Sequence, residues 1–193
     1  MRQMLITLFA ITIFAIGCSN ESAERFATRS GTSGPGSPTD EAAAEIEIYS
    51  AVIRRLVTKD HTFGRGTSPF KYVYVVDGPI KDADDPREDL FGPASKPFST
   101  DVTDGIEEEL RDLPPVRFVA DGNDVRRGKE GMGGVKKDGV IISLGSIERK
   151  KGRANVSNAL WCGGLCGQWM TYVLTQEGGG WRITGTTGPY VIS

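Results

Sequence analysis

Two cysteines near the end of the chain have the spacing best suited to chemistry. Cys162 and Cys166 stand in the run LWCGGLCGQW, and two of the three residues between them are glycine. Such a short segment can turn tightly enough to bring the two Cα atoms within disulfide range, and we predict a bridge that closes a hairpin. Two buried free thiols, a redox pair and a metal site are the alternatives. The redox pair lacks the two-residue spacing and the helix start that would lower a thiol pKa.

His61 is the only histidine of the chain and lies in the run KDHTFGRG. An imidazole oriented by Asp60 or Asp77 could act as a general base, which would make the protein an enzyme. The alternative is that His61 follows a helix and hydrogen-bonds its last carbonyl groups, where the helix dipole favours the imidazolium. No serine or cysteine can be tied to His61 by sequence, so we predict no catalytic residue and keep His61 as the one candidate. One histidine and one cysteine pair are also too few ligands, so neither a metal nor another cofactor is predicted.

Two loop-like segments contain charged residues at ligand-like spacing. The segment 78–100 is acidic and interrupted by prolines. It matches no calcium-loop pattern, so a solvated loop is expected there. The glycine-rich run 128–139 neither follows a firm strand nor opens a helix, so a flap over one end of the sheet is expected in place of a phosphate site. The acidic residues of the first segment are Asp82, Asp84, Asp85, Glu88 and Asp89, shortly after Asp77.

Aromatic side chains suggest where a ligand pocket could lie. Trp161 and Trp169 bracket the cysteine turn, where they could line the mouth of a pocket or pack around the bridge. A deep apolar pocket would bind an unknown small molecule or a protein of the cell envelope. The candidate pocket residues are Tyr72, Tyr74, Trp161 and Tyr172.

Two helices are predicted to support these residues. Residues 41–59 carry apolar side chains at three- and four-residue spacing, and Asp40 or Thr39 can cap the start. A second helix is predicted over 101–113, where Pro114 stops it.

The remaining elements read as strands, and the last third of the chain contains four of them joined by hairpin-like turns. Apolar and polar residues alternate there, which predicts a meander with one buried face, and such a face needs a helix to cover it. We therefore predict an α+β domain: a curved antiparallel sheet with a C-terminal four-strand meander, covered by the N-terminal amphipathic helix and a second short helix. The predicted strands are 70–77, 116–120, 140–147, 153–162, 170–176 and 181–186.

The leading helix and the tail YVLTQEGGGWRI resemble NTF2-like and other cystatin-like domains, in which a strand, a turn and a G-x-W-x-I/V strand form the last hairpin. The resemblance covers residues 41–60 and 138–187. The tail and the CGGLCG run also resemble small exported bacterial proteins of unassigned function. Neither resemblance supplies catalytic residues.

The start of the chain predicts export and a lipid anchor. Arg2 precedes an apolar run, residues 4–16, that is long enough for a signal peptide and too short to span a bilayer comfortably. The ending AIGC resembles the lipobox of bacterial lipoproteins, although Ala15 stands where leucine is usual. The resemblance implies cleavage before Cys18, lipidation of its thiol and stable anchoring by two or more acyl chains. The alternatives are a plain secreted protein that is cut nearby and a chain in which residues 4–16 form a buried N-terminal helix of the fold. An exported chain reaches an oxidising compartment, which favours the cysteine bridge.

The predicted organisation is a signal peptide over 1–17, a lipidated cysteine with a disordered tether over 18–40, and one domain over 41–193. The chain has 23 basic and 25 acidic residues, a near balance that argues against a nucleic-acid partner. We expect a lipoprotein on the extracytoplasmic face of the cell membrane that binds a ligand or partner without catalysis. The alternatives are an envelope enzyme that uses His61 and an assembly or scaffold accessory, which an exposed apolar patch would mark.

Overall fold

The computed structural model describes residues 39–63, 68–128 and 133–193. The predicted signal peptide, Cys18 and the tether up to residue 38 lie outside the described residues, as do residues 129–132 of the glycine-rich run. Within the described ranges, no helix combines the length and the apolar character needed to cross a membrane.

Two α-helices form where the apolar spacing predicts them. Helix α1 spans Asp40–Thr58, and its N-cap Thr39 accepts a hydrogen bond from the Ala42 amide at 3.2 Å. Its buried residues recur at intervals of three or four, so one side of the helix is apolar. Helix α2 spans Thr100–Glu109 and is capped by the Ser99 side chain.

Helix α2 is shorter than the predicted range 101–113, and the cause is a contact with α1. The Glu109 carbonyl accepts a hydrogen bond from Arg54 Nη2 at 2.9 Å. Arg54 also forms an ion pair with Asp112 at 2.6 Å. These bonds hold the residues after Glu109 in a turn against α1, so the helix ends before Pro114 is reached.

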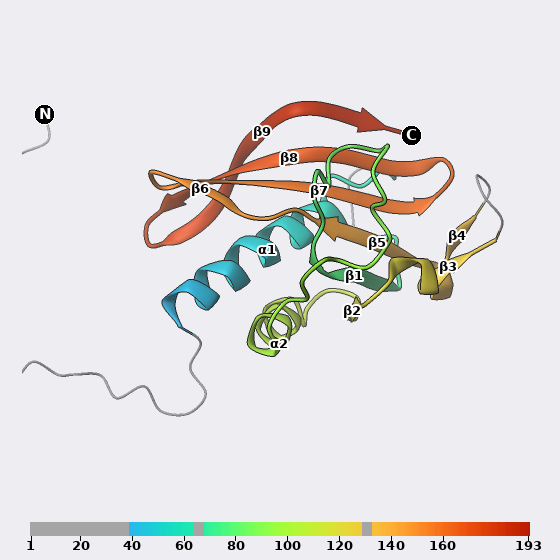
Figure 1. Ribbon diagram of the computed structural model, residues 1–193, viewed down its shortest axis with the longest axis horizontal. Helices are drawn as coiled ribbons and strands as arrows, with labels where there is room; N and C mark the ends of the chain where they lie inside the picture. Colours follow the sequence, from blue (N-terminus) through green and yellow to red (C-terminus); the bar gives the residue numbers. More distant parts are fainter. Residues whose placement is uncertain (1–38, 64–67, 129–132) are drawn as a thin grey trace, which may run out of the picture. The chain divides into compact units, whose positions relative to one another are not determined.

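The strands of the described residues form one sheet, in which β7 pairs with β4, β5, β6 and β8, and β9 pairs with β8 (Figure 1). Its main path runs in the order β2-β1-β5-β7-β4-β3. Two short 3-10 helices, η1 Gly122–Val125 and η2 Lys136–Asp138, lie beside the small strands. The strands are β1 Tyr72–Pro79, β2 Val116–Val119, β3 Arg126–Arg127, β4 Gly134–Val135, β5 Gly139–Leu144, β6 Glu148–Lys150, β7 Arg153–Gly163, β8 Cys166–Glu177 and β9 Gly180–Ile192.

The prediction of an α+β fold is confirmed, but the prediction of an antiparallel sheet is wrong for its first strands. Strand β1 pairs in parallel with β2 on one side and with β5 on the other. Parallel neighbours need long crossover connections, and the chain between β1 and β2 supplies one that contains α2. From β5 onward the pairings β5–β7, β7–β8 and β8–β9 are antiparallel.

Two strands of the last third extend beyond their predicted ends. Strand β8 begins at Cys166 where 170 was predicted, because its pairing with β7 continues up to the cysteine turn. Strand β9 continues to Ile192 where 186 was predicted, and register shifts in its pairing with β8 absorb the glycines and Pro189.

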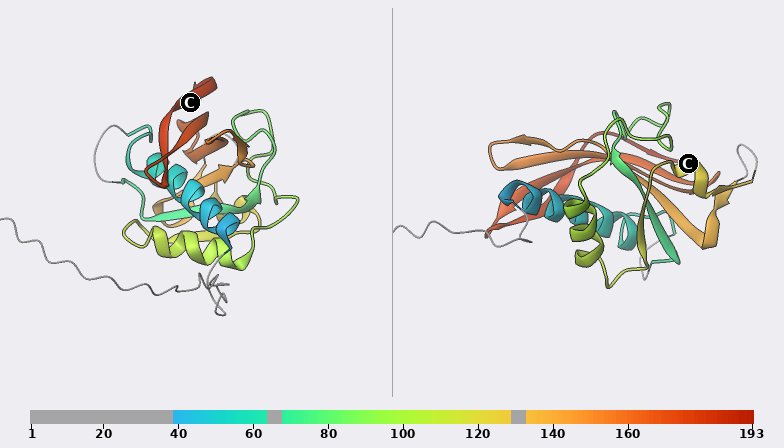
Figure 2. Two further views of the ribbon diagram at one scale, coloured as in Figure 1. Left: turned by 90° about the vertical axis from the view of Figure 1, so that its left-hand side faces the viewer. Right: turned by 60° about the horizontal axis from the view of Figure 1, so that its bottom comes forward.

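Side chains are buried on both faces of the sheet, in two separate clusters. One cluster joins α1 and α2 to residues such as Val75 of β1 and Leu160 of β7. The other joins Tyr74 of β1 and Trp161 of β7 to residues of the loop after β1, including Leu90. Figure 2 shows the two helices on one side of the sheet and this loop on the other. The loop therefore covers part of the second face and borders the outward side chains of β6 to β9.

Candidate binding groove

A groove runs between the loop 80–87 and the outward face of β6 to β9, and three adjoining cavities form it. The central cavity has a volume of about 510 Å³. It shares Asp82 and Asp84 with a neighbouring cavity of about 410 Å³. It shares Glu148, Asn155 and Thr187 with another of about 330 Å³. The three cavities therefore adjoin one another at these residues, and we refer to them together as the groove.

The floor of the groove is a row of hydroxyl groups that strand pairing brings together. Ser157 of β7 lies opposite Thr171 of β8, and Thr171 lies opposite Thr187 of β9. Side chains alternate between faces along a strand, and these positions face away from α1 because Val156 and Tyr172 beside them belong to the helix-side cluster. All three hydroxyl residues line the central cavity.

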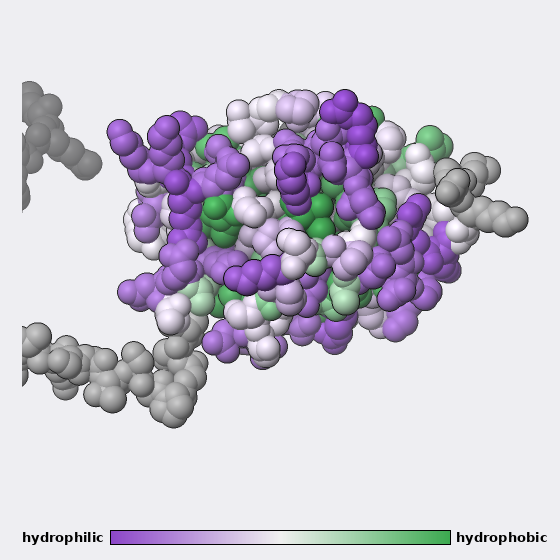
Figure 3. Space-filling model, in the orientation of Figure 1, coloured by the Kyte–Doolittle hydropathy of each residue, from purple (hydrophilic) through white to green (hydrophobic). Residues whose placement is uncertain are grey.

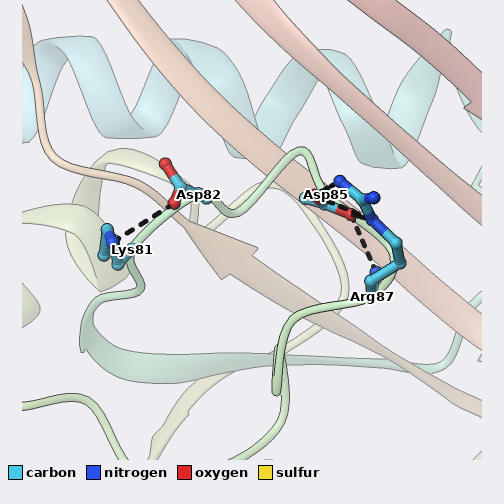
Figure 4. A network of polar contacts seen from close by, with 4 residues as sticks. All are labelled: Lys81, Asp82, Asp85 and Arg87. Carbon is cyan, nitrogen blue, oxygen red and sulfur yellow. Dashed lines mark hydrogen bonds and ion pairs between the residues drawn. The ribbon is translucent and has the colours of Figure 1, made fainter.

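The wall of the groove is attached to its floor by a single side-chain hydrogen bond. Thr171 Oγ1 donates to Asp84 Oδ2 at 2.7 Å, across a sequence separation of 87 residues. On either side of Asp84, an ion pair joins two residues of the loop to each other (Figure 4). Lys81 lies 3.7 Å from Asp82, and Arg87 holds Asp85 through several hydrogen bonds. The hydrogen bonds from Arg87 lower the pKa of the Asp85 carboxyl to about 2, so this group stays ionised at all physiological pH values.

The central cavity is lined mainly by polar residues. On the face seen in Figure 1, hydrophilic residues dominate and apolar residues are visible only in small patches (Figure 3). Among the described residues, Asp84 and Glu148 form no ion pair, although both line the central cavity. The central cavity is therefore acidic.

The structure places His61 away from the groove, in an aromatic cluster. Its ring packs against Phe63 and Phe70, with centroid distances of 6.4 and 6.0 Å. Nδ1 accepts a hydrogen bond from the Phe63 amide at 3.3 Å, and Nε2 is buried without a partner among the described residues. Burial lowers the pKa of the imidazole, and the nearby Asp60 charge partly opposes that shift. The side chain is therefore a neutral, largely enclosed group.

Neither acidic residue considered as a partner for His61 forms a hydrogen bond with it in the described part of the chain. Asp60 Oδ2 accepts from Arg55 Nε at 2.6 Å and from the Tyr172 hydroxyl at 2.8 Å. Asp77 Oδ1 accepts from the Phe98 amide at 3.2 Å. Both carboxylates thus hold other segments in place, and the geometry contains no acid–histidine pair.

Cys162 and Cys166 lie at disulfide distance, as the sequence predicts, with their Cα atoms 5.2 Å apart. They flank the tight turn between β7 and β8, where Gly163 pairs with Cys166. The Thr62 hydroxyl contacts Cys166 Sγ at 3.4 Å. The segment that follows α1 therefore contacts the end of this hairpin at the cysteine pair.

The four candidate pocket residues are divided between the two faces of the sheet: Tyr72, Tyr74 and Trp161 belong to one buried cluster and Tyr172 to the other. Tyr72 and Tyr74 stack on each other with centroids 6.1 Å apart. Trp161 packs against Phe91, and the Arg126 guanidinium lies 4.9 Å from its ring. Tyr172 is fully buried on the helix side of the sheet, where burial raises the pKa of its hydroxyl. The four side chains therefore do not form one binding surface.

The acidic loop is held against the sheet more closely than a solvated loop would be. Ala83 and Leu90 are buried, and the Ser143 hydroxyl donates to the Leu90 carbonyl. Asp89 Oδ1 accepts from the Gly92 amide at 3.0 Å. In the ranges that the structure describes, no three His, Cys, Asp or Glu side chains are arranged to hold a metal ion.

Sequence reasoning pointed to the acidic loop but missed the residues of the groove floor. Ser157, Thr171 and Thr187 are single polar positions within strands, and alternation alone predicts only that Ser157 and Thr171 face away from the apolar side. Their common row depends on the strand register, which the sequence does not show. The signal that could have found them is the excess of hydroxyl side chains on the outward positions of the last strands.

In comparisons with protein-family models, curated proteins and solved structures, no match to this chain was found.

Proposed function

We propose that this protein is a lipid-anchored extracytoplasmic protein whose α+β domain binds a polar ligand in the groove without transforming it. The observation that supports this function best is the hydroxyl row on the floor of the central cavity, with Asn155 beside it. Hydroxyl and amide groups both donate and accept hydrogen bonds, so such a floor suits a ligand rich in hydroxyl or amide groups.

The composition of the groove supports binding over catalysis. Among the described residues, its lining includes no histidine and no cysteine. Asp82 and Asp85 are already paired with cations of the same loop. An enzyme that uses His61 is the alternative, and it would require that residue to reach a substrate from its buried position.

The anchor is supported by the sequence. The apolar leader, the lipobox-like ending before Cys18 and the polar segment that follows match a lipidated protein on a flexible tether.

Ligand binding is tested by thermal-shift screening of the purified protein against neutral saccharides, polyols, amino acids and amines. Every compound that stabilises the protein is then measured by calorimetry on Thr187→Val and Asn155→Ala. Thr103→Val, a hydroxyl deletion on α2, is the matched control. We expect about 3- to 10-fold weaker binding for each groove variant, as for the loss of one hydrogen bond, and no change for the control. Binding that both groove variants leave unchanged would place the ligand outside the groove.

The anchor is tested by the intact mass of protein extracted from membranes. We expect a chain that begins at Cys18 with two or three acyl groups, and a Cys18→Ser variant that leaves the membrane fraction. An unmodified Cys18 in membrane-extracted protein would reject the anchor and leave the groove proposal standing.

An assembly or scaffold accessory is the second candidate, and exposed apolar side chains favour it. Leu165 is 92% exposed at the β7–β8 turn, and Ile192 is 56% exposed on β9 beside the same end of β8. Phe63 is 61% exposed and follows Thr62, which contacts Cys166 in this turn. A photo-crosslinker placed at Leu165 in cells would capture a defined partner if this function holds, whereas one placed at Asp104 on α2 would not.

A further inference from the structure

We infer that the end of the domain around the β7–β8 turn docks directly on an anionic lipid surface, in a contact separate from the predicted anchor at Cys18. Two independent features of this end carry the inference. Exposed apolar side chains gather there, and lysines without a carboxylate partner lie beside them. The inference does not depend on the groove being a ligand site.

The large apolar side chains that remain exposed gather at this end of the sheet. Leu165 lies at the β7–β8 turn, and Ile192 lies on β9 beside the same end of β8. Phe63 follows the residue whose hydroxyl contacts Cys166 Sγ, and Tyr190 stands two positions before Ile192 on β9. In the ranges that the structure describes, these four are the exposed large apolar residues, and we call their surface the apolar end.

A cationic segment borders the apolar end. Gly134 of β4 lies opposite Gly163, next to the β7–β8 turn, and Figure 1 shows β3 and β4 at the same end of the sheet as that turn. The described residues of 121–138, taken together with Lys71, include more cations than carboxylates. The cations are Arg126, Arg127, Lys136, Lys137 and Lys71, and the carboxylates are Asp121, Asp124 and Asp138. This segment is therefore net positive.

Two lysines of this segment have no carboxylate partner. Lys136 donates to the backbone carbonyl of Asp124, and the Lys137 ammonium lies 4.7 Å from the centroid of the Tyr72 ring. The adjoining carboxylate, Asp138, pairs with a different lysine at 3.0 Å. Among the described residues neither Lys136 nor Lys137 forms an ion pair, and both side chains are exposed. Their charges are therefore available to anions outside the chain.

This combination of side chains favours a lipid surface over a protein partner. Anionic headgroups attract lysine and arginine, and the acyl region below them removes apolar side chains from water. Lysine is depleted at protein interfaces, whereas at a membrane its long side chain keeps the ammonium group among the headgroups. Tyr190 adds a ring of the kind that is enriched at headgroup depth.

The position of the predicted anchor allows this contact. Helix α1 begins at the opposite end of the sheet, where Glu41 pairs with Arg149 of β6 at 2.9 Å. The 19 residues of α1 span about 28 Å. About 20 residues separate Cys18 from the start of α1, a length of chain that reaches up to about 70 Å when extended. An anchored chain can therefore turn the apolar end toward the membrane that holds it.

Photo-crosslinking of the full chain on lipid vesicles tests the inference. A crosslinking residue replaces Leu165 in one variant and Lys151 in the other, which lies at the β6–β7 turn, at the opposite end of β7. The vesicles contain phosphatidylcholine with or without the anionic lipid phosphatidylglycerol, and lipid adducts are identified by mass. We expect adducts at Leu165 to be at least about 5-fold more abundant with the anionic lipid, and to exceed those at Lys151 by a similar factor. The readout records contact of one residue with lipid, so a failure of the anchor does not affect it.

Paired lysine variants test the charge. Lys136→Gln/Lys137→Gln should lower the yield of lipid adducts at Leu165 at least about 5-fold, because each lysine near an anionic surface contributes about that factor. Lys150→Gln/Lys151→Gln is the matched control, since it removes the same charge at the opposite turn, and it should leave the yield unchanged. Equal adducts at both turns, or adducts at Leu165 that the first pair does not lower, would overturn the docking.

The same crosslinker at Leu165 in cells separates a lipid surface from a protein partner. Lipid adducts are expected there as well. Crosslinks to one defined protein, with no lipid adduct, would overturn the inference and favour the assembly accessory. The ligand screen with Thr187→Val and the intact mass at Cys18 would still decide the groove and the anchor separately.

Discussion

Reduction of the cysteine pair should weaken the domain without unfolding it. Cys162 and Cys166 are four positions apart, so the bridge closes one of the shortest loops that a disulfide can close. The pairing of β7 with β8 runs without interruption from Arg153 and Thr175 to Trp161 and Gly167, and one register shift separates it from the last pair, Gly163 and Cys166. The hairpin is therefore held by its ladder and its core contacts in addition to the bridge.

The magnitude follows from the length of the closed loop. In the chain-entropy treatment, cross-linking a loop of about 5 residues removes about 7 cal/mol/K from the unfolded state, which is about 2 kcal/mol at 25 °C. A loop of about 100 residues would give more than twice that value. For a domain of this size, 2 kcal/mol corresponds to a fall in Tm of about 4–8 °C.

Urea unfolding followed by tryptophan fluorescence measures this loss, since Trp161 and Trp169 are nearly buried beside the turn. The free energy of unfolding is compared with and without reductant, and a Cys162→Ala/Cys166→Ala chain serves as the control that reductant should not affect. A loss above about 4 kcal/mol, or unfolding of the reduced chain in water, would refute the reasoning. It would mean that the bridge holds the native hairpin together in addition to limiting the unfolded chain.

Three further changes test the interactions around the core. Tyr172→Phe keeps the buried ring and removes the hydrogen bond to Asp60. Urea unfolding should show a free energy of unfolding that is about 2 kcal/mol lower. An unchanged stability would mean that water replaces the hydrogen bond. Burial lowers the pKa of His61 in the folded state, so the unfolded chain binds a proton at this residue more readily. The free energy of unfolding should therefore fall as the pH drops below about 6.5. His61→Gln should remove this pH dependence, measured by denaturant titrations at each pH. Gly78 has a φ of 125°, and a Cβ there would meet the Lys96 carbonyl oxygen. Gly78→Ala should therefore lower the free energy of unfolding by at least about 1–3 kcal/mol in urea unfolding. A variant as stable as the wild type would contradict this geometry.

Local features of the fold could be predicted from the sequence because they depend on neighbouring residues. The spacing of apolar side chains predicts α1 to within one residue at each end. The glycines between Cys162 and Cys166 similarly determine that the chain can turn back and bring the thiols together. These elements need no information about distant parts of the chain.

Features that depend on distant segments could not be predicted. Parallel pairing of β1 follows from how the connections cross the sheet, which no short pattern encodes. The groove needs Asp84 to reach Thr171 from a different part of the chain. That Tyr172 lies on the opposite face from Tyr74 could not be predicted for the same reason, since the face that each residue occupies depends on strand register.

The position of β1 also affects how the chain reaches its folded state. In the parallel pairings, Tyr72 lies opposite Gly139 of β5 and Val73 lies opposite Val116 of β2. Both edges of β1 therefore stay unpaired until these later segments have been synthesised. Contacts of such long sequence separation slow folding, because loop closure precedes the gain from pairing. Until residues of β5 are available, the valines of β1 stay unprotected and can associate with other chains. The yield of folded protein should therefore depend on whether a chaperone binds the first half of the domain until β5 is available.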